Sequence, residues 1–242
     1  MARGCRRGFK GVYMKKILVA AASLMLALPL TLSAKGKTVR VQALNGKAEP
    51  VQVEVPYNPK RVAILDLAAL DILDNLGLGS RVVGSATTSI SYLTAYSPDK
   101  NKKIKNIGNI KTPDLEALFA CQPDVIFIGG RLASRYDELS EIAPVVYLAT
   151  DMQAGLVESV KKNALAIASM FGKEKEVEAK MAGFAGRIAA LNKQAAGKSA
   201  LLGMVTSGSC NLLGNGGRLN LITNEVGFEN IGAGLSGSRQ SG

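Results

Sequence analysis

The chain has 242 residues, of which 47% are hydrophobic and 5% aromatic, and it contains no histidine. This length suits one large domain or two small ones. Because histidine is the commonest transition-metal ligand and general base, its absence excludes a His-built metal site, a His-ligated haem and a Ser-His-Asp triad.

The formal net charge of +11 is concentrated at the start of the chain. Residues 1–34 contain six basic residues and no acid, which leaves 24 basic against 19 acidic residues, or +5, in the rest. A nucleic-acid-binding protein typically has a basic stripe with stacking aromatics. We therefore expect no nucleic-acid partner.

Residues 1–34 are predicted to be a secretory signal peptide. A basic segment opens at Met14, which is the better initiator, and residues 17–32 are mostly apolar. Ser33 and Ala34 offer small residues for cleavage. A membrane-spanning helix needs about 20 apolar residues, so a retained anchor is the less favoured alternative. No cysteine stands at the cleavage point, and we expect an exported, unanchored protein of the periplasm.

Residues 35–152 are predicted to form an N-terminal α/β lobe. Apolar and polar residues alternate at 39–41 and 51–55, which indicates a hairpin. The elements expected next are a buried strand at 61–65, a helix capped by Asp66 and stopped by Gly77, a strand at 81–84, a helix starting at Thr112-Pro113-Asp114, a strand at 124–128, a helix at 134–142 and a strand at 145–148. This alternation predicts a parallel sheet with right-handed crossovers.

Residues 153–196 break this alternation. Apolar residues recur at helical spacing from Val157 to Phe171 and again from Val177 to Leu191, with no strand between them. We interpret the two helices as a bridge between lobes. The alternative is a helical hairpin packed on the first lobe.

Residues 197–242 are predicted to be part of a C-terminal lobe. A buried strand is expected at 200–205, a loop at 206–217 and a helix at 218–227. An independent lobe normally needs about 100 residues, so the sequence predicts that this second lobe is incomplete.

Three cysteines occur in the sequence, and Cys121 and Cys210 follow the predicted signal peptide. They lie in different halves of the chain, so we favour two buried free thiols over a disulfide bridge. No completed phosphate-binding motif, paired carboxylates or nucleophile with its base is present, and we expect no enzymatic activity.

Gly130-Arg131 follows the buried run at 123–129. Ligands of open α/β sheets bind at the carboxyl ends of the strands, where Arg131 is expected to lie. A guanidinium is planar and always charged, so it suits an anionic, aromatic or multi-oxygen ligand. The alternative is a solvated loop arginine.

Several segments together resemble the periplasmic substrate-binding proteins of iron-siderophore ABC importers, whose two Rossmann-like lobes are joined by a long helix. The block from Gly130-Arg131 to Pro144 resembles the branch that takes catecholate-type siderophores. The other matching segments are 57–62, 70–77, 106–108, 112–116, 122–127 and 214–218.

The resemblance implies a non-enzymatic, monomeric protein that binds a ferric siderophore and delivers it to an importer permease. Arg131 and Arg218 would face the ligand from the two lobes. Tyr92 and Tyr96 could line the mouth of the cleft, and the alternative is that they are solvent-exposed loop tyrosines. Glu116 matches an acid that forms a salt bridge with the permease, although an acid near a helix N-terminus is also favoured by the helix dipole.

No cofactor is implied, because the chelator already fills the coordination sphere of the iron. The alternatives are another chelate on the same fold (a hydroxamate siderophore, haem or a corrinoid), a nucleotide-using α/β enzyme, or a truncated, non-functional product.

Overall fold

The computed structural model describes residues 36–151, 154–206, 209–216 and 219–234. Both the predicted signal peptide, residues 1–34, and Arg218 lie outside these residues. Among the described residues, no helix combines the length and the apolar character needed to cross a membrane.

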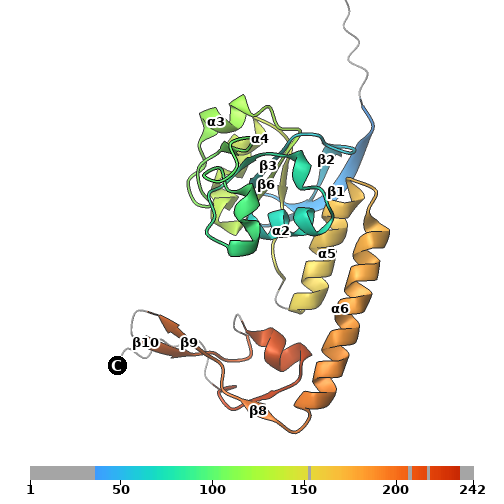
Figure 1. Cartoon of the computed structure of the whole chain (residues 1–242), viewed down its shortest axis with the longest axis vertical. Helices are drawn as coiled ribbons and strands as arrows, with labels where there is room; N and C mark the ends of the chain where they lie inside the picture. Colours follow the sequence, from blue (N-terminus) through green and yellow to red (C-terminus); the bar gives the residue numbers. More distant parts are fainter. Residues whose placement is uncertain (1–35, 152–153, 207–208, 217–218, 235–242) are drawn as a thin grey trace, which may run out of the picture. The chain divides into compact units, whose positions relative to one another are not determined.

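A seven-stranded sheet forms the centre of the first part of the chain (Figure 1), in the order β2-β1-β7-β6-β3-β4-β5. From β3 to β7 the neighbouring strands are parallel, while β1 and β2 form an antiparallel hairpin whose β1 joins β7. The strands are β1 Thr38–Leu44, β2 Pro50–Pro56, β3 Val62–Leu65, β4 Val82–Ser85, β5 Lys105–Asn106, β6 Val125–Ile128 and β7 Val145–Tyr147. The predicted α/β class with a parallel sheet is confirmed.

Helices follow most of these strands. The α-helices are α2 Leu67–Asn75, α3 Leu115–Ala120, α4 Tyr136–Ser140, α5 Leu156–Ser169 and α6 Glu174–Ala195. Short 3-10 helices are η1 Gly79–Arg81, η2 Ser91–Tyr96 and η3 Gly130–Arg135. The expected helix at 134–142 is therefore a 3-10 turn that leads into a short α-helix.

Both faces of the central strands β3, β6 and β7 are buried. In β3, Val62 and Ile64 belong to a core cluster that includes residues of α2 and α5, whereas Ala63 and Leu65 belong to a second cluster with residues of α3 and α4. All four residues of β3 are buried. A strand covered on both faces has a continuous apolar run, which is why this strand was predictable from the sequence.

Helix α3 begins two residues later than expected. Asp114, rather than Thr112, is the N-cap, and its Oδ1 accepts a hydrogen bond of 2.9 Å from the Ala117 amide. Pro113 instead forms an isolated bridge with Gly108, which keeps residues 112 and 113 out of the helix.

The two helices expected after the sheet are present as α5 and α6. Helix α5 contacts β1 and α2 and packs along α6. In α6 the buried residues are Val177 and Ala195. The division of the chain at residues 152 and 196, and the role of these helices as a bridge, stay predictions.

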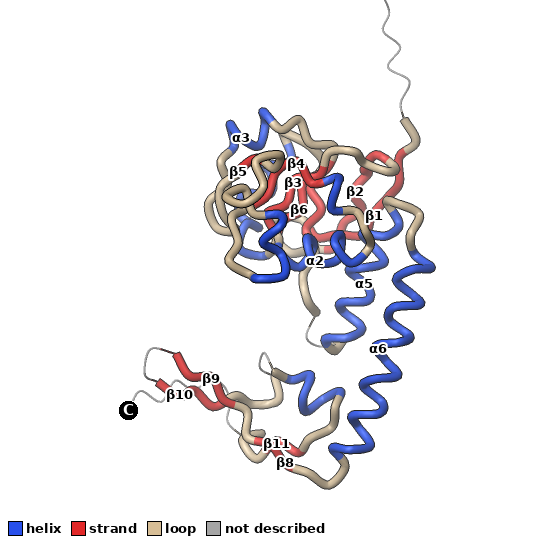
Figure 2. Tube along the Cα trace, in the orientation of Figure 1, coloured by secondary structure: helices blue, strands red, loops and turns tan. Residues whose placement is uncertain are grey.

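Residues 199–234 contain small sheets instead of the single buried strand expected at 200–205 (Figure 2). Strand β8 (Ser199–Ala200) pairs in parallel with β11 (Glu229–Asn230), and β9 (Gly203–Thr206) pairs with β10 (Ser209–Leu212). The expected loop at 206–217 therefore includes a strand. Of the helix expected at 218–227, the described residues contain a π-helical turn, η4, at Leu221–Glu225.

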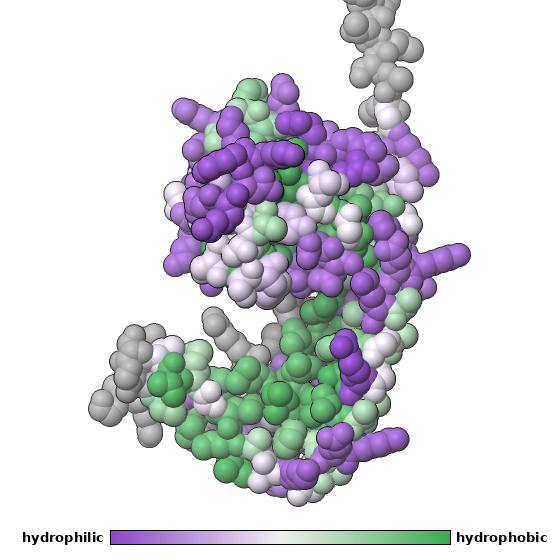
Figure 3. Space-filling view, in the orientation of Figure 1, coloured by the Kyte–Doolittle hydropathy of each residue, from purple (hydrophilic) through white to green (hydrophobic). Residues whose placement is uncertain are grey.

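Hydrophobic side chains remain at the surface of this last part of the chain, where Figure 3 shows a concentration of apolar surface. Within residues 199–234, the exposed large hydrophobic residues are Leu201, Met204, Val205, Leu212, Leu219 and Ile231.

The prediction of two buried thiols is half right: Cys121 and Cys210 are both free, but Cys121 is buried and Cys210 is exposed.

Candidate ligand-binding site

A cavity of about 310 Å³ lies at the carboxyl ends of β3, β6 and β7. This edge is where open α/β sheets bind ligands, and it is the place that the sequence predicts for Arg131. The residues that line it are Leu65, Asp66, Leu67, Ala68, Ile110, Gly129, Gly130, Arg131, Leu148, Ala149, Thr150 and Asn163.

Two glycines bring the chain to this position between neighbouring side chains. A Cβ built on Gly129 would lie 3.4 Å from Oδ1 of Asp66, and one on Gly130 would lie 3.1 Å from the hydroxyl of Tyr147. The contact at Gly129 would be of ordinary van der Waals length, whereas a Cβ at Gly130 would press against the Tyr147 hydroxyl, so the close approach after β6 is at Gly130. Arg131 follows directly in the first turn of η3 and is exposed.

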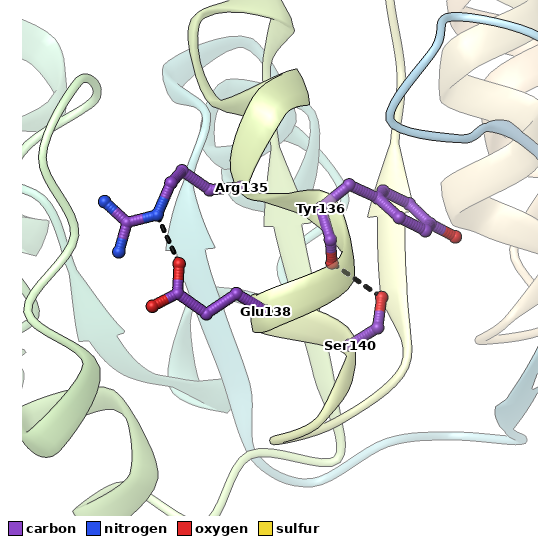
Figure 4. A network of polar contacts seen from close by, with 4 residues as sticks. All are labelled: Arg135, Tyr136, Glu138 and Ser140. Atoms are coloured by element: carbon purple, nitrogen blue, oxygen red, sulfur yellow. Dashed lines mark hydrogen bonds and ion pairs between the residues drawn. The ribbon is translucent and has the colours of Figure 1, made fainter.

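Arg131 differs from Arg135, the next arginine of the same 3-10 helix, in its side-chain contacts. Arg135 forms an ion pair with Glu138 (Figure 4), and this hydrogen bond lowers the pKa of the Glu138 carboxyl. Figure 4 also shows the Ser140 hydroxyl donating to the Tyr136 carbonyl, at 2.8 Å. Within the described part of the chain, the Arg131 side chain has no hydrogen-bond or ion-pair partner. It is therefore available to an anion in the cavity.

Asp66 contributes a carboxylate to the same cavity. It caps α2, with Oδ1 accepting a hydrogen bond of 3.2 Å from the Ala68 amide. Burial raises the pKa of this carboxyl, although hydrogen bonds from the backbone of Ala68 and Ala69 oppose the shift. The sequence identified Asp66 only as a cap. Its place directly after β3, matching that of Gly129 after β6, was the signal that it also lines the cavity.

The remaining wall is mixed in character. Asn163 of α5 donates a hydrogen bond of 3.0 Å from Nδ2 to the Ala149 carbonyl. Ile110 adds an apolar side chain from the loop after β5. Neither residue was singled out in the sequence, because contacts between such distant segments depend on the fold.

The two tyrosines expected at the cleft do not line this cavity. Tyr92 is 66% exposed. The Tyr96 hydroxyl donates to Oδ1 of Asp74 on α2, and burial together with this hydrogen bond raises the pKa of Tyr96 to about 12. The structure thus gives Tyr96 a partner outside the cavity, and a ligand contact by either tyrosine stays a prediction.

Glu116 lies in the first turn of α3 and is exposed. Its contact with a permease stays a prediction. Among the described residues, no group of three or more His, Cys, Asp or Glu side chains is placed to hold a metal ion.

A larger groove of about 680 Å³ lies between α2, α5 and α6 and does not include Arg131. Apolar side chains such as Val160, Val177 and Phe184 line it. Lys180 and Arg187 also line this groove, but it does not lie at the carboxyl ends of the parallel strands, so we regard the cavity at Arg131 as the candidate site.

A cavity at the carboxyl ends of the strands of an α/β sheet, lined by a few polar side chains such as Arg131, is a place where small ligands bind. Residues 62–241 match the family model described as periplasmic binding protein, and the chain belongs to this family.

Among curated proteins, the chain is similar to the petrobactin-binding protein YclQ of Bacillus subtilis. The identity is 33% over 218 residues, which cover 86% of this chain and 68% of YclQ. The ferric-anguibactin-binding protein FatB of Vibrio anguillarum is 24% identical over 226 residues, covering 87% of this chain and 68% of FatB.

Solved structures agree with this assignment. The crystal structure of YclQ matches with a TM-score of 0.76 and 31% identity, covering 84% of this chain and 70% of YclQ. The periplasmic catecholate-siderophore binding protein VctP of Vibrio cholerae matches with a TM-score of 0.71 and 26% identity, covering 85% of this chain and 70% of VctP. The resemblance inferred from the sequence is confirmed.

Proposed function

We propose that this chain is the periplasmic solute-binding protein of an ABC importer, and that it captures a ferric siderophore of the catecholate type. The observation that supports this most directly is Arg131, which lines the cavity at the carboxyl ends of β3, β6 and β7 and has no hydrogen-bond or ion-pair partner among the described residues. The names of YclQ and VctP, which state siderophore ligands, point in the same direction.

The chemistry of such a ligand suits these residues. A ferric tris-catecholate is anionic, and its six oxygens already fill the coordination sphere of the iron. The protein therefore needs no metal ligand, but it does need a cation that tolerates contact with flat rings. Arginine supplies charge, hydrogen bonds and stacking together.

We further propose that Arg218 contacts the ligand as a second cation and that Tyr92 contributes at the rim. Glu116 is proposed to bind a cationic side chain of the permease. On this proposal, Glu116→Lys abolishes siderophore uptake while the affinity of the chain for its ligand stays unchanged. A drop in ligand affinity would instead assign Glu116 a structural or ligand-binding role.

The test of function is co-elution of the whole chain with a ferric tris-catecholate on gel filtration, followed by the visible charge-transfer band of the complex. A neutral ferric trihydroxamate serves as the matched control ligand. We expect the colour of the catecholate complex to travel with the protein and the hydroxamate complex to elute separately. Co-elution of the hydroxamate alone, or of neither complex, would contradict the proposal.

A further inference from the structure

The candidate cavity contains a negative group as well as a positive one. Leu65 of β3 pairs with Ile128 of β6 in the sheet, so Asp66 and Gly129 are the next residues on two adjacent strands. Asp66 is half-buried and lines the cavity together with Arg131. A ligand held by Arg131 therefore lies beside a carboxylate.

The negative charge of the Asp66 carboxylate has few hydrogen-bond donors around it. Its hydrogen bonds come from the first backbone amides of α2, while a carboxylate offers about four acceptor positions. Among the described residues no cation lies within ion-pair distance of it. A partly buried carboxylate that lacks a partner is destabilised, and a hydrogen-bond donor on the ligand would relieve this cost.

The capping role of Asp66 does not require its charge. Asn caps a helix about as well as Asp does, because the cap is made by a side-chain oxygen that accepts a backbone hydrogen bond. The cap uses Oδ1. A simple cap thus explains the position of the side chain but not the presence of a carboxylate in a cavity for an anion, where it repels the ligand.

We propose that Asp66 determines specificity by accepting a hydrogen bond from a protonated amine on the backbone of the ferric chelate whose oxygens meet Arg131. The preferred ligand is then an anionic iron complex with a cationic group in its scaffold. This inference rests on the proposed function and narrows the class of ligand from catecholates in general to amine-bearing catecholates.

The test uses two synthetic tris-catechol ligands loaded with Fe(III). They are identical except that one backbone carries a protonated secondary amine where the other carries a methylene group. We expect the whole chain to bind the amine complex about tenfold more tightly, the size expected for one hydrogen bond to a charged group. In Asp66→Asn, which keeps the cap, the ratio of the two affinities should fall to about one.

Asp71→Asn is the matched control, because Asp71 is a second acid of α2 that lines the other groove and not this cavity. It should keep the tenfold ratio. Circular dichroism and thermal melting of both variants separate a change in specificity from a loss of folding. Equal binding of the two complexes by the wild type, or a ratio that survives in Asp66→Asn, would overturn the inference while leaving the proposed function standing. If the wild type binds neither complex, the proposed function itself fails, and the inference fails with it.

Discussion

Strands of the same length differ in burial between the first half of this chain, which contains the seven-stranded sheet, and the second half, which contains the small sheets of residues 199–234. In β6, from Val125 to Ile128, all four residues are buried, whereas in β9, from Gly203 to Thr206, all four are exposed. Strand β6 lies between β3 and β7 in a sheet with helices on both faces, while β9 pairs with β10 in a two-stranded sheet. Burial, and with it stability, therefore comes from the layers that cover a strand.

The largest difference between the halves should appear when a side chain is shortened in each. Phe127 is 0% exposed and Val205 is 75% exposed. We expect Phe127→Ala to lower the free energy of unfolding by about 3–5 kcal/mol. Val205→Ala should change it by no more than about 0.5 kcal/mol. Urea unfolding of both variants measures this, and similar losses would show that the two halves form one equally packed core.

A smaller effect tests where α3 begins inside the well-packed half. Asp114→Ala removes the cap to the Ala117 amide and should cost about 1 kcal/mol of unfolding free energy. Thr112→Ala should cost less than about 0.5 kcal/mol, because Thr112 lies outside the helix. A larger loss of unfolding free energy for Thr112→Ala than for Asp114→Ala would show that Thr112 is the cap.

Tyr96 tests a polar contact at the surface of the same half. Tyr96→Phe removes the hydrogen bond to Asp74 and should cost about 1 kcal/mol. Because the folded pKa of Tyr96 is raised from 10.0 to about 12, the wild type should lose its advantage over Tyr96→Phe as the pH rises through this interval. If the wild type stayed more stable than Tyr96→Phe above about pH 12, the assignment of a hydrogen bond from Tyr96 to Asp74 would be contradicted.

The smallest effect concerns Asp66. Burial raises the pKa of the Asp66 carboxyl in the folded state above its ordinary value, so the ionised carboxylate costs stability at neutral pH, and protonation removes this cost as the pH falls. The stability of Asp66→Asn relative to the wild type should therefore be greater at about pH 7 than at about pH 3.5. Chemical unfolding at the two pH values measures the difference, and the opposite trend would mean that the folded state favours the ionised carboxylate.

The fold of the first half was largely predictable because its signals are local. Apolar runs such as 62–65 and 125–128 identify strands buried on both faces, and Asp66 and Gly77 correctly bound α2. The predicted start of α3 was wrong because Thr112 and Asp114 are both good capping residues. Only the bridge between Gly108 and Pro113 decides between them.

The second half was less predictable because its strands lack such runs. Strand β10 begins Ser-Cys-Asn, a composition typical of a loop. The sequence predicted only part of the candidate site. Arg131 was predictable because it follows a recognisable strand, whereas Asn163 and Ile110 reach the cavity from separate segments. The same rule that identified Arg131, a polar residue just after a buried parallel strand, also applies to Asp66.

The most direct measurement is an equilibrium titration of the whole chain with a ferric tris-catecholate, comparing Arg131→Ala with Arg135→Ala. The two arginines belong to the same 3-10 helix, but only Arg131 lines the cavity, while Arg135 is paired with Glu138. We predict that Arg131→Ala weakens binding by about 2–5 kcal/mol and that Arg135→Ala has little effect. Equal losses, or no loss in either variant, would contradict the assignment of the cavity as the ligand site.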